Sequence, residues 1–372
     1  MPPIDYAWLD RAFALAERGR LTVSPNPMVG AVVVLRGRVV GEGFHRRAGE
    51  PHAEILALAQ AGAAARGADL YLTLEPCAHQ GLTPPCAPAV AGSGVRRVVV
   101  AASDPNPLVA GRGLAALRMA GVDVRRAPDS WRRREEAQNE RFRSWIVSKR
   151  PFVLAKWAAT LDGKIAAASG ESRWITGPAA RRRALKLREE YDAVLVGAGT
   201  VAADDPRLTR RLSRGRSGTH WRIVLDGRLR VPAAARVFSG PGHKIVVTAL
   251  RLPHPKARRL ERRGVEVWSL PGRRRGSVDL RRLLAELGRR GVSSVMVEGG
   301  AETLAAFFEA GLVDRVAVFT APRILGGRSA KGAIGGRGFS LGRAAELEDM
   351  ACEPVGNDLL WTARVRRRRP AR

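Results

Sequence analysis

The stretch that decides the fold runs from His52 to Cys86. It opens with PHAE, residues 51–54, and closes with EPCAHQGLTPPC, residues 75–86. One imidazole (His52) and two thiols (Cys77 and Cys86) are good zinc ligands, and three protein ligands leave the fourth tetrahedral position open for water. Zinc lowers the pKa of such a water to about 7. Glu54 follows the histidine by two residues, so its carboxylate can take a proton from that water and return it to a leaving amine.

His-x-Glu followed by Pro-Cys and a second cysteine is typical of zinc-dependent base deaminases. The spacing departs from the usual Cys-x-x-Cys, because eight residues separate Cys77 from Cys86. A chance histidine near two buried cysteines would need Glu54, Pro76 and both thiols to be coincidental. We therefore expect one catalytic zinc per chain, with Glu54 as the catalytic proton carrier.

The composition allows two domains and gives no sign of a membrane span. The chain has 372 residues, of which 45% are hydrophobic, and it has no apolar run of 18 residues and no signal-peptide pattern. Three cysteines provide no disulfide framework, and thiolate ligands suit a reducing cytoplasm. The third cysteine, Cys352, is expected to be a buried, inert thiol.

The net charge of +29 raises the question of nucleic acid. The arginines are spread along the whole chain, and aromatic residues, which would stack on bases, make up only 5%. We expect no specific nucleic-acid partner and no membrane partner. A phosphorylated small molecule would be attracted by the same charge.

The first 150 residues alternate between helical and strand patterns, which predicts an α/β sandwich. Charged residues from Trp131 to Ser148 predict a single helix, and Lys149-Arg150-Pro151 interrupts it. We place a deaminase domain at 1–147, a second domain at 151–366 and a disordered basic tail at 367–372. The expected helices are 5–19, 53–59, one starting near Cys86, and 113–120; the expected strands are 29–35, 39–43, 68–74, 97–102 and 122–125.

The second domain repeats the α/β rhythm and contains two glycine turns. One, Glu298-Gly299-Gly300, follows a strand and starts a helix, where backbone N–H groups can hold phosphate. The other, residues 197–200, matches a dinucleotide fingerprint loosely and is followed by Asp204-Asp205-Pro206 instead of a regular helix. The expected strands are 152–156, 194–197, 221–226, 244–249, 265–270, 292–297, 313–319 and 359–364; the expected helices are 280–290 and 304–310.

These motifs resemble those of one family, the bifunctional deaminase/reductases of riboflavin biosynthesis. HAE followed by EPC-x-H-x-G-x-TPPC matches the deaminase half. Lys156 to Lys164, Gly170 to Thr176, Gly197 to Pro206 and Glu298 to Gly300 match the reductase half in order. The resemblance implies a cytidine-deaminase-like α/β/α sandwich, then an α/β domain similar to dihydrofolate reductase.

The resemblance also implies a reaction. The first domain would hydrolyse the 2-amino group of 2,5-diamino-6-ribosylamino-4-pyrimidinone 5′-phosphate, and the second would reduce the ribosyl group to ribityl with NADPH. By position, the residues implied to contact NADPH are Ala158, Trp174, Thr200, Asp204, Gly300, Ala301, Glu302, Thr303, Leu304, Ala305 and Ala306. Those implied to contact substrate are Asn26, His45, His79, Asp104 and Asn106 in the deaminase, and Lys156, Ser172, Arg188, Leu208, Arg211 and Glu298 in the reductase.

One position departs from the family pattern. Leu82 stands where the family usually has a basic residue that would pair with the substrate phosphate. That contact must come from elsewhere, with His79 or an arginine as candidates, or substrate binds more weakly. A homo-oligomer is expected, although nothing in the sequence sets its size.

Two other interpretations remain open at this stage. The chain could be a single-activity zinc deaminase of nucleosides, nucleotides or tRNA with a C-terminal binding module. It could also be a basic RNA-binding protein with a structural zinc, although three ligands and a free Glu54 speak against that. NADPH binding by the second half, metal content and ammonia release would separate these alternatives.

Overall fold

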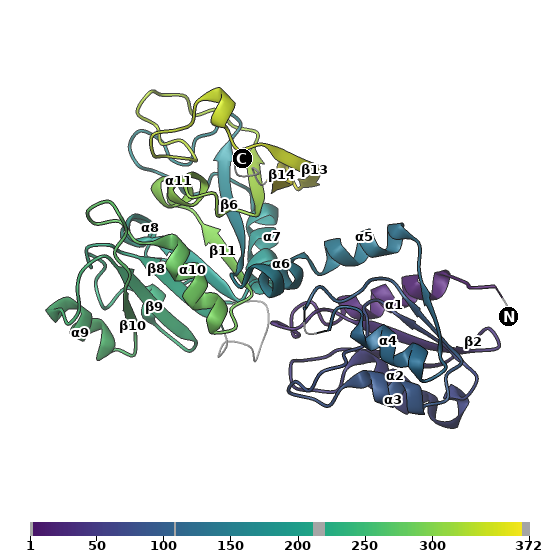
Figure 1. The fold of residues 1–372 in the computed structure, drawn as a ribbon. Helices are drawn as coiled ribbons and strands as arrows, with labels where there is room; N and C mark the ends of the chain where they lie inside the picture. The colour runs from purple at the N-terminus through teal and green to yellow at the C-terminus, as the bar shows by residue number, and fades with distance from the viewer. Residues whose placement is uncertain (1–2, 108, 211–219, 367–372) are drawn as a thin grey trace. The chain divides into compact units, whose positions relative to one another are not determined.

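The computed structural model describes residues 3–107, 109–210 and 220–366. Arg211 and the tail 367–372, which carry two of the expectations above, lie outside the described residues. The chain divides into two compact units, Met1–Lys149 and Arg150–Arg372, shown as a ribbon in Figure 1. Among the described residues no helix combines the length and the apolar character needed to cross a bilayer.

The first unit is built on a five-stranded sheet of order β2-β1-β3-β4-β5. Strand β1 runs antiparallel to both neighbours, and β3, β4 and β5 are parallel. The central strands are rich in valine and leucine because both faces of the sheet are covered. The bounds are β1 Gly30–Leu35, β2 Arg38–Phe44, β3 Asp69–Leu72, β4 Arg97–Val100 and β5 Asp123–Arg126.

Helices cover both faces of this sheet, so the unit is an α/β/α sandwich. One face packs Ala57, Val90 and Leu114 against the strands, and the other packs Phe13 and, at its border, Trp131. The helices of the first face are α2 Ala53–Ala61, α3 Cys86–Gly92 and α4 Arg112–Met119; those of the second are α1 Ala7–Glu17 and α5 Asp129–Gln138.

The predicted single helix over 131–148 is wrong, because Asn139 interrupts it. Helix α5 ends at Gln138, and α6 spans Glu140–Ser148. The Asn139 side chain is buried and bonds both backbone groups of Met28: Met28 N–H donates to Oδ1 (2.8 Å) and Nδ2 donates to the Met28 carbonyl (3.0 Å). An asparagine that satisfies a distant buried backbone in this way competes with a continuous helix.

The second unit has a nine-stranded sheet of order β10-β9-β8-β7-β11-β6-β12-β14-β13. The seven strands from β10 to β12 are parallel, and β14 and β13 close one edge as an antiparallel hairpin. The bounds are β6 Phe152–Thr160, β7 Ala193–Gly197, β8 Trp221–Leu225, β9 His243–Thr248, β10 Glu266–Ser269, β11 Ser294–Glu298, β12 Arg315–Ala321, β13 Leu347–Val355 and β14 Asp358–Val365.

Helices again pack on both faces of the sheet (Figure 1). On one face Leu283, Leu287 and Phe307 cover the central strands, and on the other Val201 and Leu260 do so. The first face carries α10 Leu280–Arg289 and α11 Ala301–Glu309; the second carries α7 Pro178–Glu189, α8 Ala198–Asp204 and α9 Pro255–Glu261.

Three features of this unit differ from the expectations. The glycine turn at 197–200 continues into the short helix α8. Helices α7 and α9 and strand β13 were not expected; α7 and α9 are rich in arginine, which hides their apolar stripes. Cys352 is exposed rather than buried, because β13 is an edge strand whose residues from Leu347 to Pro354 are all exposed.

The first unit depends on a close approach at Gly30. A Cβ there would lie 1.9 Å from the Ala12 carbonyl oxygen, so α1 can rest on β1 only if residue 30 is glycine. Gly30→Ala should cost about 1–3 kcal/mol by overpacking, and it should lower the urea concentration at the midpoint of unfolding of this unit. Gly92→Ala is the matched control, because nothing lies within 4 Å of its added Cβ. Equal midpoints for the two variants would contradict this account.

Candidate active sites

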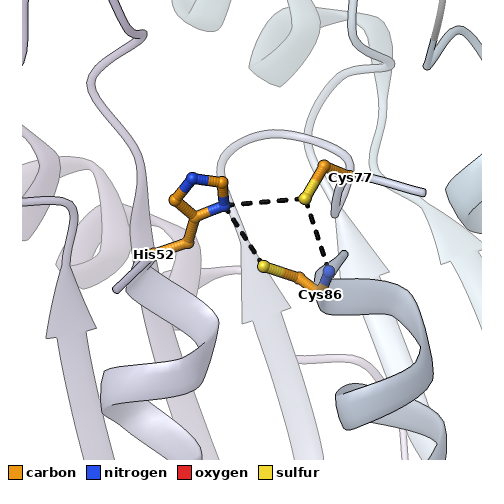
Figure 2. A group of neighbouring side chains, drawn as sticks. All are labelled: His52, Cys77 and Cys86. Carbon is orange, nitrogen blue, oxygen red and sulfur yellow. Dashed lines mark hydrogen bonds between the residues drawn. The ribbon is translucent and has the colours of Figure 1, made fainter. Parts of the chain in front are cut away.

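Three chain segments bring the predicted zinc ligands together. His52 precedes the first residue of α2, Cys77 lies in the turn after β3, and Cys86 is the first residue of α3. Their ligand atoms all lie within 4.8 Å of one another. Figure 2 shows the imidazole facing both sulfurs.

The spacing of the ligand atoms fits a tetrahedral zinc site. His52 Nδ1 lies 3.2 Å from Cys86 Sγ and 3.6 Å from Cys77 Sγ. Zinc bonds of about 2.0 Å to nitrogen and 2.3 Å to sulfur place such ligands about 3.5 Å apart. The other ring nitrogen, Nε2, lies 3.3 Å from Thr83 Oγ1. A hydrogen bond of this kind orients a metal-bound imidazole. Thr83 belongs to the TPPC segment, but no role was predicted for it.

The thiols have the electrostatics of a cation site. A hydrogen bond from Cys86 lowers the pKa of Cys77 to about 4, and His52 contributes to the same shift. The Cys86 backbone N–H also points at the Cys77 sulfur, 3.4 Å away. The pKa of Cys86 is raised, first by its hydrogen bond to Cys77. The pair by itself therefore accommodates one negative charge, and a divalent cation allows two thiolates.

Glu54 lies in the first turn of α2 and is fully buried. Burial raises the pKa of its carboxyl group, and the nearby His52 opposes that shift. A carboxylate with a raised pKa takes and returns a proton readily at neutral pH. Its position beside the ligand cluster is the one that the sequence predicted for the proton carrier.

Asn26 and His45 adjoin the metal ligands. Asn26 Nδ2 lies 3.0 Å from His45 Nε2, and the His45 ring meets the His52 ring edge to face at 4.9 Å. Burial, followed by the neighbouring His52, lowers the pKa of His45 to about 4, so its ring is neutral at pH 7. The buried Asn139 holds Met28, two residues after Asn26, and so supports this side of the site.

His79, Asp104 and Asn106 lie on loops beside the ligand turn. Burial raises the pKa of Asp104 to about 6, with a smaller opposing effect of His79, and Asp104 Oδ1 accepts the Asn106 N–H at 2.8 Å. Within the described residues, the buried Nδ1 of His79 has no hydrogen-bond partner. Leu82 is 83% exposed. Its side chain is a hydrocarbon, so it cannot replace a basic residue in pairing with a phosphate.

In the second unit, Lys156 and Glu298 are partners on adjacent parallel strands, β6 and β11. Arg188 of α7 makes a two-pronged ion pair with Glu298, with Nε–Oε1 at 2.5 Å and Nη2–Oε2 at 2.8 Å. Burial alone would raise the pKa of Glu298, but Arg188 and Lys156 outweigh it and bring the pKa down to about 2. Burial lowers the pKa of Lys156. The structure thus brings three of the six expected reductase contacts together.

Leu208 has a left-handed backbone (φ 51°), and its carbonyl accepts a hydrogen bond from His220 Nε2 at 3.2 Å. His220 is buried and was not predicted to take part in a site, since a lone histidine before a strand is typical of a core position. Its proximity shows in its small contribution to the lowered pKa of Glu298. Ser172 lies on the loop before α7, with no described contact to this cluster.

The residues expected to contact a nucleotide gather at the carboxyl ends of β7 and β11. Gly300 precedes α11 with φ 81°, and a Cβ there would lie 2.9 Å from Thr200 Oγ1 and 3.4 Å from Thr303 Oγ1. A Cβ at Gly197 would lie 2.3 Å from Thr303 Oγ1. Both glycines therefore allow α8 and α11 to lie close together. The N–H groups of the first turn of α11 have no partner within the helix and can donate to a ligand.

The remaining expected positions differ in their surroundings. Ala158 lies on β6, and the exposed Trp174 has Arg181 over its ring at 4.4 Å. Asp204 ends α8 and binds Arg173 through its carboxylate at 3.1 Å. Glu302 is occupied by the chain itself, since it accepts the Gly336 N–H at 3.4 Å. Leu304 is a core residue, and Ala301, Ala305 and Ala306 belong to the same first turns of α11.

Taken together, the fold and the two sites define a zinc-dependent deaminase followed by a reductase of the dihydrofolate-reductase type. Two family profiles match: "Cytidine and deoxycytidylate deaminase zinc-binding region" over residues 3–102 and "RibD C-terminal domain" over residues 151–361. The riboflavin biosynthesis protein RibD of Aquifex aeolicus is 43% identical over 96% of this chain and 97% of its own. The Escherichia coli RibD is 42% identical over 87% of this chain and 89% of its own.

Solved structures agree with these sequence matches. Acinetobacter baumannii RibD superposes with a TM-score of 0.85 at 35% identity, covering 97% of this chain and 98% of its own. A deaminase/reductase from Thermotoga maritima gives a TM-score of 0.84 at 34% identity, over 96% of this chain and 98% of its own. The chain belongs to the RibD family and is a bifunctional deaminase and reductase of riboflavin biosynthesis. The expected fold class is confirmed.

Replacing one thiol should remove the metal and the deamination together. We expect Cys77→Ser to lose zinc and ammonia release, because serine is a poor zinc ligand and the site then keeps only two good donors, His52 and Cys86. Elemental analysis of the purified chain should give about one zinc per wild-type chain. The matched control is Cys352→Ser, an exposed cysteine in the other unit. Full zinc retention in Cys77→Ser would remove Cys77 from the site.

Proposed function

We propose that the chain deaminates 2,5-diamino-6-ribosylamino-4-pyrimidinone 5′-phosphate and then reduces the ribosyl group of the product to ribityl with NADPH. The observation that carries the proposal is the presence of two chemically different clusters in one chain: His52, Cys77 and Cys86 beside Glu54, and Glu298 ion-paired with Arg188 beside Lys156. The Thermotoga maritima relative is described as a diaminohydroxyphosphoribosylaminopyrimidine deaminase and 5-amino-6-(5-phosphoribosylamino)uracil reductase.

In the deaminase, zinc held by His52, Cys77 and Cys86 supplies an activated water at neutral pH. Glu54 takes a proton from the attacking water and delivers it to the departing amino nitrogen. Asn26, the neutral His45, His79, Asp104 and Asn106 border this position and offer donors and acceptors to the pyrimidine and its sugar. With Leu82 exposed and apolar, His79, three residues earlier in the same loop, is our candidate for the phosphate contact.

In the reductase, NADPH supplies the hydride when bound. Gly300 and the first turn of α11 offer backbone N–H groups and the positive end of a helix to its pyrophosphate. Lys156, in the middle of β6, Glu298, at the end of β11, and Arg188 of α7 form a partly buried charged cluster, which positions the phosphorylated sugar. Ser172, Leu208 and Arg211 complete the set that the family implies. The thiolate ligands of the zinc site favour a reducing cytoplasm as the location of the protein.

The direct test is to incubate the full chain with the phosphorylated diaminopyrimidine, with and without NADPH, and to identify products by mass. Without NADPH we expect only the deaminated product. With NADPH we expect that product with its ribosyl group reduced. Conversion of cytidine or deoxycytidylate instead, with no reduction, would favour the single-activity deaminase.

The two activities should be separable. Glu54→Gln keeps the shape of the side chain but cannot accept a proton, so deamination should fall by about 10⁴-fold or more. Zinc content should be unchanged, and the variant should still reduce deaminated substrate that is supplied directly. Near-normal ammonia release from Glu54→Gln would end the proposed role of this carboxylate.

Gly300→Asp should weaken NADPH binding at least tenfold, because a side chain and a negative charge would both meet the pyrophosphate. The matched control is Gly311→Asp, which also replaces a positive-φ glycine but lies at the other end of α11, where nothing is within 4 Å. NADPH titrated into each folded variant gives the dissociation constants. Equal affinities in the two variants would move the pyrophosphate away from Gly300.

A homo-oligomer formed along β13 explains its exposure. This nine-residue edge strand carries Leu347 and Met350 at 47% and 64% exposure, and open edges pair readily with a second strand. We expect Met350→Glu to reduce the mass measured by analytical ultracentrifugation to that of one chain. Leu341→Glu, a 94% exposed position outside β13, should leave the mass unchanged. A Met350→Glu chain with the wild-type mass would place the interface elsewhere.

A further inference from the structure

Glu75 is a buried carboxylate that the chemistry described so far does not use. It lies two residues before the zinc ligand Cys77 and is 4% exposed. Four backbone N–H groups donate to it: Gly113 at 3.0 Å and Leu114 at 3.2 Å to Oε1, and Gly111 at 3.0 Å and Asp104 at 3.3 Å to Oε2. An ionised carboxylate accepts at both oxygens and donates nothing, which matches four donors.

The four donors come from both ends of one connection between β4 and α4. Gly111 caps α4, and Gly113 and Leu114 belong to its first turn, whose N–H groups have no partner within the helix. Asp104 lies at the other end of the connection, soon after β4. The Glu75 side chain therefore accepts hydrogen bonds from both ends of the connection that carries Asp104 and Asn106. The positive end of the α4 dipole favours the negative charge of this carboxylate.

The same place is tied to the turn that holds the metal ligand. A Cβ at Gly113 would lie 1.9 Å from the Pro76 carbonyl oxygen, so α4 rests directly on the residue before Cys77. Asp104 in turn accepts the Asn106 N–H at 2.8 Å. Glu75 thus links the ligand turn to Asn106 through two hydrogen-bonded steps, without facing the reacting atoms itself.

We propose that Glu75 is a positioning residue for deamination: it fixes Asp104 and Asn106 relative to the zinc-ligand turn and so sets the affinity for the pyrimidine substrate. This inference rests on the substrate contacts proposed for Asp104 and Asn106. It goes beyond them because Glu75, which does not touch substrate, would set the positions of the two residues that do.

The test measures binding without turnover. In the full chain carrying Glu54→Gln, the dissociation constant of the phosphorylated diaminopyrimidine is measured by calorimetry with and without Glu75→Gln. The glutamine amide presents N–H₂ to two of the four backbone donors, so we expect the constant to rise at least tenfold, which is about 1.4 kcal/mol. Zinc content and reductase activity should stay at the level of the parent chain.

Asp69→Asn is the matched control for loss of stability alone. Asp69 is also a buried carboxylate of this unit, but it lies at the opposite end of β3, where Arg96 and Arg97 bind it. It should leave the dissociation constant within twofold of the parent. A rise in Asp69→Asn equal to that in Glu75→Gln would overturn the positioning role.

A double-mutant cycle with Asn106→Ala separates this inference from the proposed substrate contact. If Glu75 acts through Asn106, the two changes are non-additive, and Glu75→Gln costs little once Asn106 is alanine. Additive effects overturn the inference while leaving the contact in place. An Asn106→Ala chain with unchanged affinity overturns the contact itself and, with it, the route from Glu75.

Glu75→Asp is the second variant if Glu75→Gln does not accumulate as a zinc-loaded chain. It keeps the charge and the acceptors but reaches less far, so its dissociation constant should lie between those of the parent and Glu75→Gln. A raised constant with zinc retained supports the positioning role. A constant within twofold of the parent overturns it.

Discussion

The deaminase unit depends on bringing two thiols and an imidazole within bonding distance of one cation. Cys77 and Cys86 favour a single negative charge between them, and only a divalent ion makes two thiolates stable in a half-buried place. His52 reaches them from the start of another helix. The sandwich therefore holds the end of β3 and the starts of α2 and α3 together.

In the reductase unit, charged side chains are brought together by the sheet. Parallel strands place Lys156 beside Glu298, and Arg188 comes from a helix that packs on the same sheet. Buried charges of this kind are stable only as a complete set, because removing one leaves the others unpaired in a poor solvent for ions. The charged cluster and the glycine turn before α11 share the carboxyl edge of the sheet, which is where ligands bind in open α/β sheets.

The sequence identified the chemistry better than it identified the connections. Strands such as β1 and β11 were predictable because β-branched residues form short buried runs, and the zinc ligands because their motif is local. The break at Asn139 was not predictable, because its cause is a backbone 111 residues away. Arginine-rich α7 and α9 show little amphipathic contrast, and Cys352 looked like a core thiol because nothing in the sequence marks β13 as an edge. His220 and Thr83 matter through partners that only the folded chain supplies.

The bond between Asn139 and Met28 has a consequence for how the two activities can be divided between genes or expression clones. The zinc-binding profile ends at residue 102, but the loop next to Asn26 is held from α5 and α6. A free-standing deaminase cut at the end of that profile would lose the support of its own first loop. The polypeptide is better divided after α6, where the first compact unit ends, so that Asn139 and the helices on either side of it stay with the deaminase.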